Sequence, residues 1–235
     1  MKNHQKLAIS AFVAVFLLLA NGCIPSLQPI YTEDKLVAIK ELPGTWVDAA
    51  NELNFTQQKT VMGEKKDVQV TVHQQQKETW RFKADGDKRY QLIHIDNNGN
   101  AAAFDIHVIK LGSDFFMDFY PTSMPNEDEL KQDAGIGNLV KELEKMNSLK
   151  AFHVYPVHNF AKLEVGQKQL KITMFDPDFL KNLLENQQIR IKHEKTEEGF
   201  ILTASSQELQ KFAEKYAHAK EAFLDDPIVL NRKAL

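Results

Sequence analysis

From Leu42 to about Pro121, apolar and polar residues alternate in several short stretches. Successive side chains of a β-strand point to opposite faces, so this period of two is typical of strands with one buried face. The alternating apolar residues are Leu53 and Phe55, then Val68, Val70 and Val72, then Trp80 and Phe82, and finally Phe115, Met117 and Phe119. The pattern predicts an antiparallel β meander, which forms either an open sheet or a closed barrel.

The strongest turn signal in this region is Asn98-Gly99. A two-residue type I′ turn needs positive φ at both central positions, which Asn and Gly tolerate. Such a turn pairs Ile93 with Phe104 across the hairpin. It predicts one apolar face, formed by Ile93, Ile95, Phe104 and Ile106. The opposite face is predicted to point to solvent and carries Tyr90, His94, Asp105 and His107.

Beyond Met124 the chain mixes helix and strand patterns. Leu139, Leu143 and Met146 recur at helical spacing after an acidic run, which predicts a helix within residues 124–149. Strand patterns occupy residues 152–165, 169–175, 189–195 and 200–204.

Two further helix starts follow these strands. Asp176-Pro177 combines an N-cap with proline at the first helical position, and Ser205 with Glu208 matches a capping box. The second helix is expected to carry Leu209, Phe212, Ala213, Tyr216 and Phe223 on one face. The predicted fold class is therefore α+β: an antiparallel β meander, sheet or barrel, followed by β-strand/helix units with two to three helices.

The N-terminus has the pattern of a secretory signal. Two lysines, Lys2 and Lys6, precede the stretch from Leu7 to Ala20, which is apolar apart from one serine. This stretch is shorter than the ~20 residues that a spanning helix needs, and it suits the apolar region of a signal peptide. The alternatives are a buried core helix and a signal that ordinary signal peptidase removes. Residues 1–22 are thus expected to be a signal peptide.

The stretch Leu18-Leu19-Ala20-Asn21-Gly22-Cys23 resembles the lipobox of bacterial lipoproteins, with Gly22 as the small residue before the cysteine. The resemblance implies cleavage after Gly22, a thioether-linked diacylglycerol on Cys23 and an acylated amino terminus, with palmitate as a typical chain. Each buried methylene contributes ~0.8 kcal/mol, so several chains give essentially permanent anchoring. Because Ile24 is not Asp, we expect the outer membrane in a cell with two membranes, and otherwise the cell membrane, with the domain on the periplasmic or extracellular side.

After the anchor the chain contains Pro25 and Pro29, which favour an extended backbone. Residues 23–41 are expected to form an extended tether, with Ile30, Tyr31 and Leu36 docking on the domain. Residues 42–235 are expected to form one α+β domain. This domain can be subdivided into a β-rich part (42–125) and a part with both strands and helices (126–235). The single cysteine excludes an intrachain disulfide.

Gly44-Thr45-Trp46 precedes the first strand pattern and resembles the G-x-W motif that opens the first strand of lipocalins. The resemblance implies a barrel whose interior could hold a small apolar ligand. We expect such a pocket to be lined by Trp46, Phe82 and Phe104, with His158 as a further candidate. The alternative is that Trp46 covers the end of an ordinary sheet.

The sequence contains no recognisable catalytic or metal-binding motif. It has no G-x-S-x-G, no Walker sequence and no pair of histidines at zinc-binding spacing. Residues His94 to Asp105 can be aligned with a calcium loop, but a histidine stands where the first oxygen ligand is needed. A net charge of −3 argues against a nucleic-acid partner. No catalytic residue, metal ligand or cofactor is therefore predicted.

Three functional hypotheses follow. The first is a lipid-anchored, non-enzymatic binding or accessory protein of the cell envelope, whose partner is another envelope protein or a small apolar ligand. The second is a lipocalin-like carrier, and the third is an envelope hydrolase with an unrecognised site that includes His158. A pocket lined by Trp46, Phe82 or Phe104 favours the carrier, whereas a filled interior favours a protein partner.

Overall fold

A computed structural model describes residues 24–49, 54–61, 64–71, 78–122, 156–197 and 199–233. The predicted signal segment, with Gly22 and Cys23, and the helix predicted within residues 124–149 lie outside the described residues. Among the helices described, none has the length and apolar character needed to cross a bilayer.

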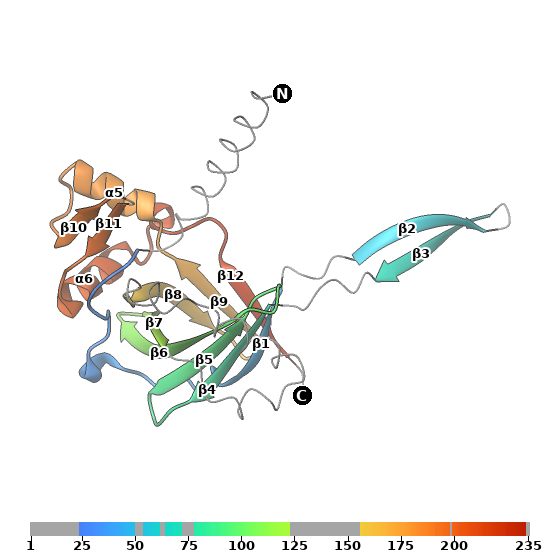
Figure 1. Ribbon diagram of the computed structural model, residues 1–235, viewed down its shortest axis with the longest axis horizontal. Coiled ribbons are helices and arrows are strands. Elements are labelled where there is room, and N and C mark those ends of the chain that lie inside the picture. The colour runs from blue at the N-terminus through green and yellow to red at the C-terminus, as the bar shows by residue number, and fades with distance from the viewer. Residues whose placement is uncertain are drawn as a thin grey trace, which may run out of the picture.

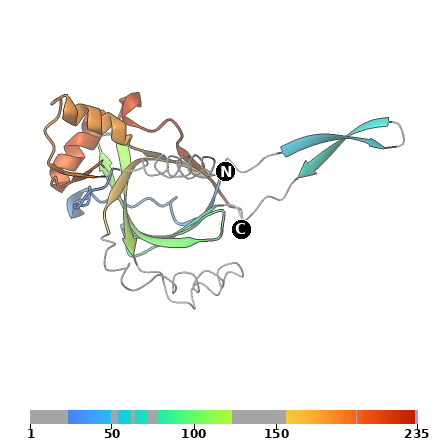
Figure 2. The ribbon, with the colours of Figure 1, turned by 45° about the horizontal axis from the view of Figure 1, so that its top comes forward.

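Eight strands form a closed antiparallel barrel (Figures 1 and 2). They are β1 (Gly44–Asp48), β4 (Thr79–Ala84), β5 (Arg89–Ile95), β6 (Ala101–Leu111), β7 (Asp114–Thr122), β8 (Asn159–Val165), β9 (Gln169–Met174) and β12 (Ile228–Arg232). Within the barrel each strand pairs with the strands that precede and follow it, and β12 pairs with β1 to close the ring. The predicted antiparallel meander is confirmed, and it takes the form of a barrel.

Two insertions interrupt the barrel strands. Between β1 and β4, strands β2 (Asn54–Val61) and β3 (Glu64–Thr71) form a separate two-stranded sheet. The strands predicted around Phe55 and Val68 therefore exist, but they do not belong to the barrel. Between β9 and β12 lie α5 (Pro177–Glu185), β10 (His193–Thr196), β11 (Gly199–Leu202), α6 (Ser206–Tyr216) and the 3₁₀ helix η2 (Lys220–Ala222). Figure 1 shows this second insertion on one side of the barrel.

Both predicted helix starts in this insertion are confirmed. The Asp176 side chain caps α5 by accepting a hydrogen bond from the Asp178 N–H, and the capping box of Ser205 and Glu208 is complete at α6. The second helix is shorter than predicted, because it ends at Tyr216. Phe223, which was expected on its apolar face, instead follows η2.

Strand β12 was not predicted from the sequence. Its apolar run Ile228-Val229-Leu230 is short and follows two aspartates and a proline, so no period of two can be recognised. Pairing with β9 on one side and β1 on the other supplies its stability. It places Leu230 in the barrel interior without exposed surface.

The predicted register of β5 and β6 is wrong by one residue. Leu92, rather than Ile93, is opposite Phe104. The turn has three residues instead of two, because Asp96 N–H bonds to the Asn100 carbonyl. The Asp96 carboxylate also accepts hydrogen bonds from the backbone N–H groups of Asn98 and Asn100, which stabilises this longer turn.

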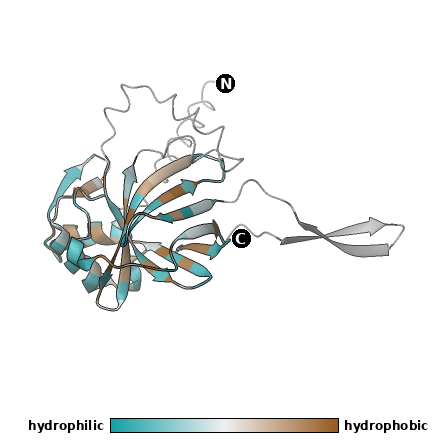
Figure 3. Ribbon diagram, turned by 90° about the horizontal axis from the view of Figure 1, so that it is seen from below, coloured by the Kyte–Doolittle hydropathy of each residue, from teal (hydrophilic) through white to brown (hydrophobic). Residues whose placement is uncertain are grey.

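A shift of one residue exchanges the two faces of a strand. Tyr90 and His94, expected to face solvent, therefore lie on the inner wall of the barrel with Leu92, whereas Ile93 and Ile95 lie on its outer wall. Figure 3 shows the resulting alternation of hydrophobic and hydrophilic residues along the strands.

Two apolar cores follow from this alternation. The inner core lies inside the barrel and includes Trp46, Phe82, Leu92, Ile106, Met117, Leu163, Leu170 and Leu230. The outer core lies between the barrel wall and the second insertion, and it includes Ile109, Phe116, Phe160, Phe175, Leu180, Leu202, Leu209 and Phe212.

Residues 24–42 are packed against the domain along their length. Ile24, Ile30 and Leu36 belong to the outer core, whereas Ile39 and Leu42 belong to the inner core. A 3₁₀ helix, η1 (Glu33–Lys35), lies between these two groups. We call residues 24–42 the N-terminal segment.

Candidate functional site

The inner wall of the barrel has two different ends. The end reached first by β1, with Trp46 and the N-terminal segment, is the base. The opposite end, where β4 begins with Trp80 and β8 begins with Asn159, is the mouth. Strand register places inward-facing aromatic and polar side chains at the mouth, namely Trp80, His94, Phe104, Phe119 and Asn159.

The base is filled by side chains. The Trp46 side chain is 0% exposed, and its indole N–H donates a hydrogen bond to the Leu42 carbonyl at 2.9 Å. The Arg232 guanidinium lies 4.2 Å from the centre of the Trp46 ring. Tyr90 links this end of the barrel to the N-terminal segment, because its hydroxyl accepts from the Ile39 N–H and donates to the Ile39 carbonyl.

This packing decides the role of two predicted pocket residues. Trp46 is fully buried and Phe82 is 2% exposed, so neither side chain lines a space open to solvent. Phe104, the third predicted residue, is half-buried and lies at the mouth. The structure thus places the three residues on one inner wall but at two different depths.

Aromatic rings meet across the barrel just inside the mouth. Trp80 on β4 and Phe119 on β7 are three strands apart around the ring, yet their ring centroids are 6.4 Å apart and their planes are nearly perpendicular. Phe104 also contacts the Phe119 ring edge to face, again at 6.4 Å. These rings form an apolar floor below the mouth.

Polar groups lie beside this floor. The Glu78 carboxylate, just before β4, accepts a hydrogen bond from the Trp80 indole at 2.9 Å, and one of its oxygens is 2.7 Å from His94 Nε2. The hydrogen bond with His94 lowers the pKa of Glu78 below its ordinary value, although partial burial opposes this shift. Glu78 is therefore a carboxylate at neutral pH.

Asn159 brings a further polar atom to the inner wall. Its Oδ1 atom is buried and has no hydrogen-bond partner. A buried acceptor without a partner costs ~1–3 kcal/mol, which makes such an atom a candidate for binding a ligand donor. Asn159 is opposite Phe119 in the β7–β8 register, so it lies beside the aromatic floor.

His158, the fourth predicted pocket residue, lies outside the barrel. Its Nδ1 atom is 2.7 Å from the carboxylate of Asp118, which is fully buried and also accepts a hydrogen bond from the Ile30 N–H. The backbone of His158 pairs with Ser26. The structure thus separates His158 from Trp46, Phe82 and Phe104.

Ser26, His158 and Asp118 are residue types that a hydrolase could use. The Ser26 side chain is completely buried, however, and its hydroxyl donates to the Gln28 carbonyl within its own turn. A nucleophile must reach its substrate and be activated by a neighbouring base. In this arrangement the three residues hold the N-terminal segment on the barrel wall.

A second histidine lies under the same segment. The ring of Tyr31 stacks on the ring of His107 at 3.9 Å, and His107 Nδ1 is buried without a hydrogen-bond partner. Burial lowers the pKa of His107 and raises the pKa of Tyr31. The prediction that His107 faces solvent is wrong, because the N-terminal segment covers this part of the outer wall.

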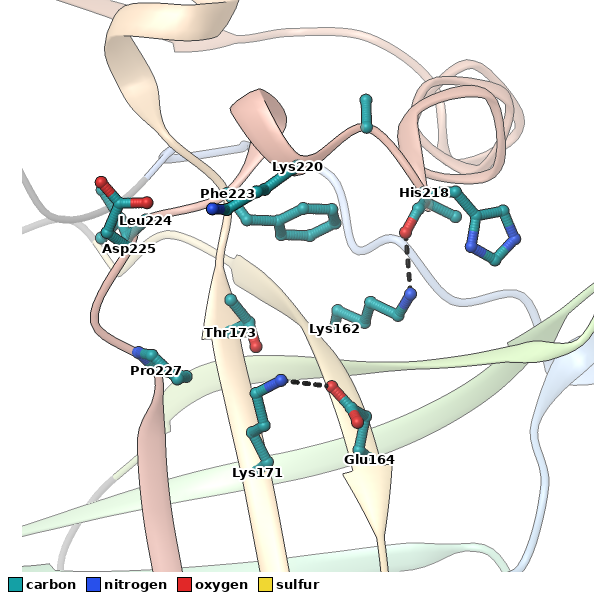
Figure 4. A pocket seen from close by; sticks show the side chains of 12 residues that line it. Lys162, Glu164, Lys171, Thr173, His218, Lys220, Phe223, Leu224, Asp225 and Pro227 are labelled. Atoms are coloured by element: carbon teal, nitrogen blue, oxygen red, sulfur yellow. Dashed lines mark hydrogen bonds and ion pairs between the residues drawn. The ribbon is translucent and has the colours of Figure 1, made fainter.

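An open groove of ≈ 370 Å³ lies outside the barrel, between strands β8 and β9 and the chain that follows α6 (Figure 4). Two of its three lysines have anionic or carbonyl partners. Lys162 bonds to Asp114 and to the Ala217 carbonyl, and Lys171 pairs with Glu164. The groove contains none of the residues predicted to line a pocket.

Besides Trp80 and Phe119, the three polar mouth residues were absent from the predicted site: Glu78, His94 and Asn159. Nothing in the local sequence distinguishes them, since they become neighbours only through the register of β4, β5 and β8.

Within the described part of the chain, no cluster of three metal-ligating side chains is present. No family model, curated protein or solved structure matches the chain.

Proposed function

We propose that the protein is a non-enzymatic binding protein of the bacterial cell envelope that takes a small, largely apolar molecule at the mouth of its barrel, in the manner of a lipocalin. One observation carries this proposal: the inner wall divides into a packed base and a mouth with aromatic rings and an unpartnered polar atom. Ligand sites commonly combine an apolar lining with a few placed polar groups.

The ligand occupies the mouth rather than the full depth of the barrel. The buried base, with Trp46 and Phe82, leaves no surface for a deeply inserted chain. Half-buried Phe104 and His94 instead offer surface near the entrance. A shallow site of this kind suits a short apolar group whose polar end stays near solvent.

The second part of the proposal concerns location. A lipid on Cys23, with cleavage between Gly22 and Cys23, holds the protein on the outer membrane or the cell membrane with its domain outside the cytoplasm. The lipobox-like stretch supports this anchor. Ile24, the first described residue after this cysteine, is only 3% exposed, so the folded domain begins directly after the anchor.

The two tryptophans allow a direct test of the binding site, because Trp46 lies at the base and Trp80 at the mouth. In a Trp46→Phe variant all tryptophan emission comes from Trp80, and in a Trp80→Phe variant it comes from Trp46. Titration with 1-octanol is expected to change the emission of Trp80 and leave that of Trp46 unchanged. A Trp80 signal that stays constant up to saturating octanol would contradict a site at the mouth.

A further inference from the structure

We infer that the molecule bound at the mouth carries an ammonium group at the end of its apolar body. This inference rests on the proposed function, since it specifies the ligand of that same site. The argument uses the sign of the charges at the mouth, the unpartnered atom of Asn159 and the arrangement of the aromatic rings.

The charged groups on the inner wall at the mouth are mainly acidic. Glu78 is a carboxylate, and Asp48 adds a second one at the end of β1, where its N–H bonds to the Glu78 carbonyl. Asp48 is opposite Leu230, which places its side chain on the inner face. The inward-facing base among the described mouth residues is His94, whose Nε2 atom is directed at Glu78.

Asn159 and Glu78 both offer acceptor atoms to a ligand. Asn159 Oδ1 lacks a donor, and a carboxylate offers about four acceptor sites, whereas the hydrogen bonds of Glu78 with Trp80 and His94 both use the same oxygen. An ammonium group supplies three donors and no acceptor. Its chemistry therefore matches that of the site.

The geometry places these acceptors around the aromatic floor. Asn159 neighbours Phe119 in the sheet, Phe119 meets the Trp80 ring, and the Trp80 indole is bonded to Glu78. Glu78 and Asn159 lie on opposite sides of the ring of strands, so an ammonium group that bonds to either one lies next to the Trp80 or the Phe119 ring. An ammonium group over an aromatic face is attracted by the electron-rich ring, and this attraction adds to its hydrogen bonds.

A carboxylate head group is disfavoured at the same position. It would offer no donor to Asn159 Oδ1 and would approach the Glu78 carboxylate with like charge, which is destabilising where water is partly excluded. A fatty acid and an amine of equal chain length thus differ only in the head group, which is a carboxylate in one and an ammonium in the other.

Calorimetric titration of the full chain with n-octylammonium and with octanoate at pH 7 tests the inference. We expect octylammonium to bind at least about tenfold more tightly, because hydrogen bonds from a charged donor are stronger than those between neutral groups. Equal binding, or tighter binding of octanoate, would overturn the inference and leave the proposed binding function intact. If neither compound binds and octanol leaves Trp80 emission constant, the proposed function fails as well.

Two variants locate the effect. Glu78→Gln is expected to bring the preference for octylammonium close to one, whereas the matched Glu164→Gln, on the outer wall, should leave it unchanged. Asn159→Leu is expected to weaken octylammonium binding about tenfold without weakening octanoate binding. A preference that survives both Glu78→Gln and Asn159→Leu would place the amine elsewhere and overturn the inference.

Discussion

At the scale of single residues, the buried polar side chains gather where the N-terminal segment docks. In the described part of the chain these are Ser26, His107, Asp118 and Gln210. Asp118 accepts a hydrogen bond from the Ile30 N–H at 3.0 Å, and Gln210 donates one to the Ile30 carbonyl at 2.9 Å. The N–H and the carbonyl of the fully buried Ile30 therefore both have partners. Leaving the two groups without hydrogen bonds would cost several kcal/mol.

His107 makes the docking of this segment sensitive to pH. Burial lowers the pKa of its imidazole below the ordinary value; Asp118, Asp105 and Glu33 oppose this shift, and Arg89 reinforces it. The unfolded chain therefore binds this proton at a higher pH than the folded protein. The contribution of His107 to stability is complete above about pH 6.5 and is lost as the pH falls through the folded-state pKa.

Replacing His107 by Phe removes this proton site and its unpartnered nitrogen but keeps a ring to stack on Tyr31. We expect the free energy of unfolding, measured by urea titration, to fall less between pH 7 and pH 5 than in the wild type, with a gain of about 1 kcal/mol at pH 7. His218→Gln is the control, because its side chain is 76% exposed. An identical fall in His107→Phe and wild type would contradict this role for His107.

At the scale of elements, closure of the barrel depends on the contact between β12 and β1. Arg232 near the end of β12 lies over the Trp46 ring and donates hydrogen bonds to the carbonyls of Pro43, Glu41 and Gln167. A planar guanidinium can make these contacts together, whereas a lysine ammonium cannot stack in this way.

We therefore expect Arg232→Met to lower the free energy of unfolding by about 2–3 kcal/mol, since a cation–π contact and several carbonyl hydrogen bonds are lost. Arg232→Lys should recover only part of this loss. The exposed Arg190, changed to Met, is the matched control and should stay close to the wild type. Chemical denaturation of the three variants measures these differences. Equal stability of Arg232→Met and wild type would show that closure does not depend on this side chain.

The same scale shows which parts of the fold the sequence could predict. A half-buried strand imposes a period of two on its own residues, so the strands with Trp80, Phe104 and Phe119 were recognisable. The β5–β6 register was not, because the side chain of Asp96 selects a longer turn than Asn98-Gly99 alone favours.

Strand β12 and the mouth escaped prediction for a related reason. The short run of β12 becomes a strand through its partners β9 and β1. Glu78 and Asn159 meet the aromatic floor only once strands β4 to β8 are in register, and His158 is separated from it because it points to the outer wall. Strand formation at β12 and the grouping of the mouth residues depend on partners far away in the sequence, so the local sequence pattern does not predict them.

At the scale of the whole molecule, the N-terminal segment connects all parts of the domain. Leu27 N–H bonds to the Leu202 carbonyl in the second insertion, Ser26 pairs with the chain before β8, and Leu36 pairs with Ile109 on β6. Leu42 then enters the inner core at the base. Because this segment is docked on the barrel, an anchor at Cys23 would also fix the position of the barrel.

Replacing Cys23 by Ser removes the thiol that a lipid anchor requires. We expect the wild-type chain in the membrane fraction and the variant in the soluble fraction, with equal melting temperatures because the described docking contacts begin after this position. Asn21→Ser keeps the thiol and should leave the protein membrane-bound. Membrane retention of the Cys23→Ser chain, with no lipid found on wild-type Cys23 by mass spectrometry, would contradict the anchor. Since the burial of Ile24 leaves no spacer, an anchor confirmed in this way would hold the barrel directly against the bilayer surface.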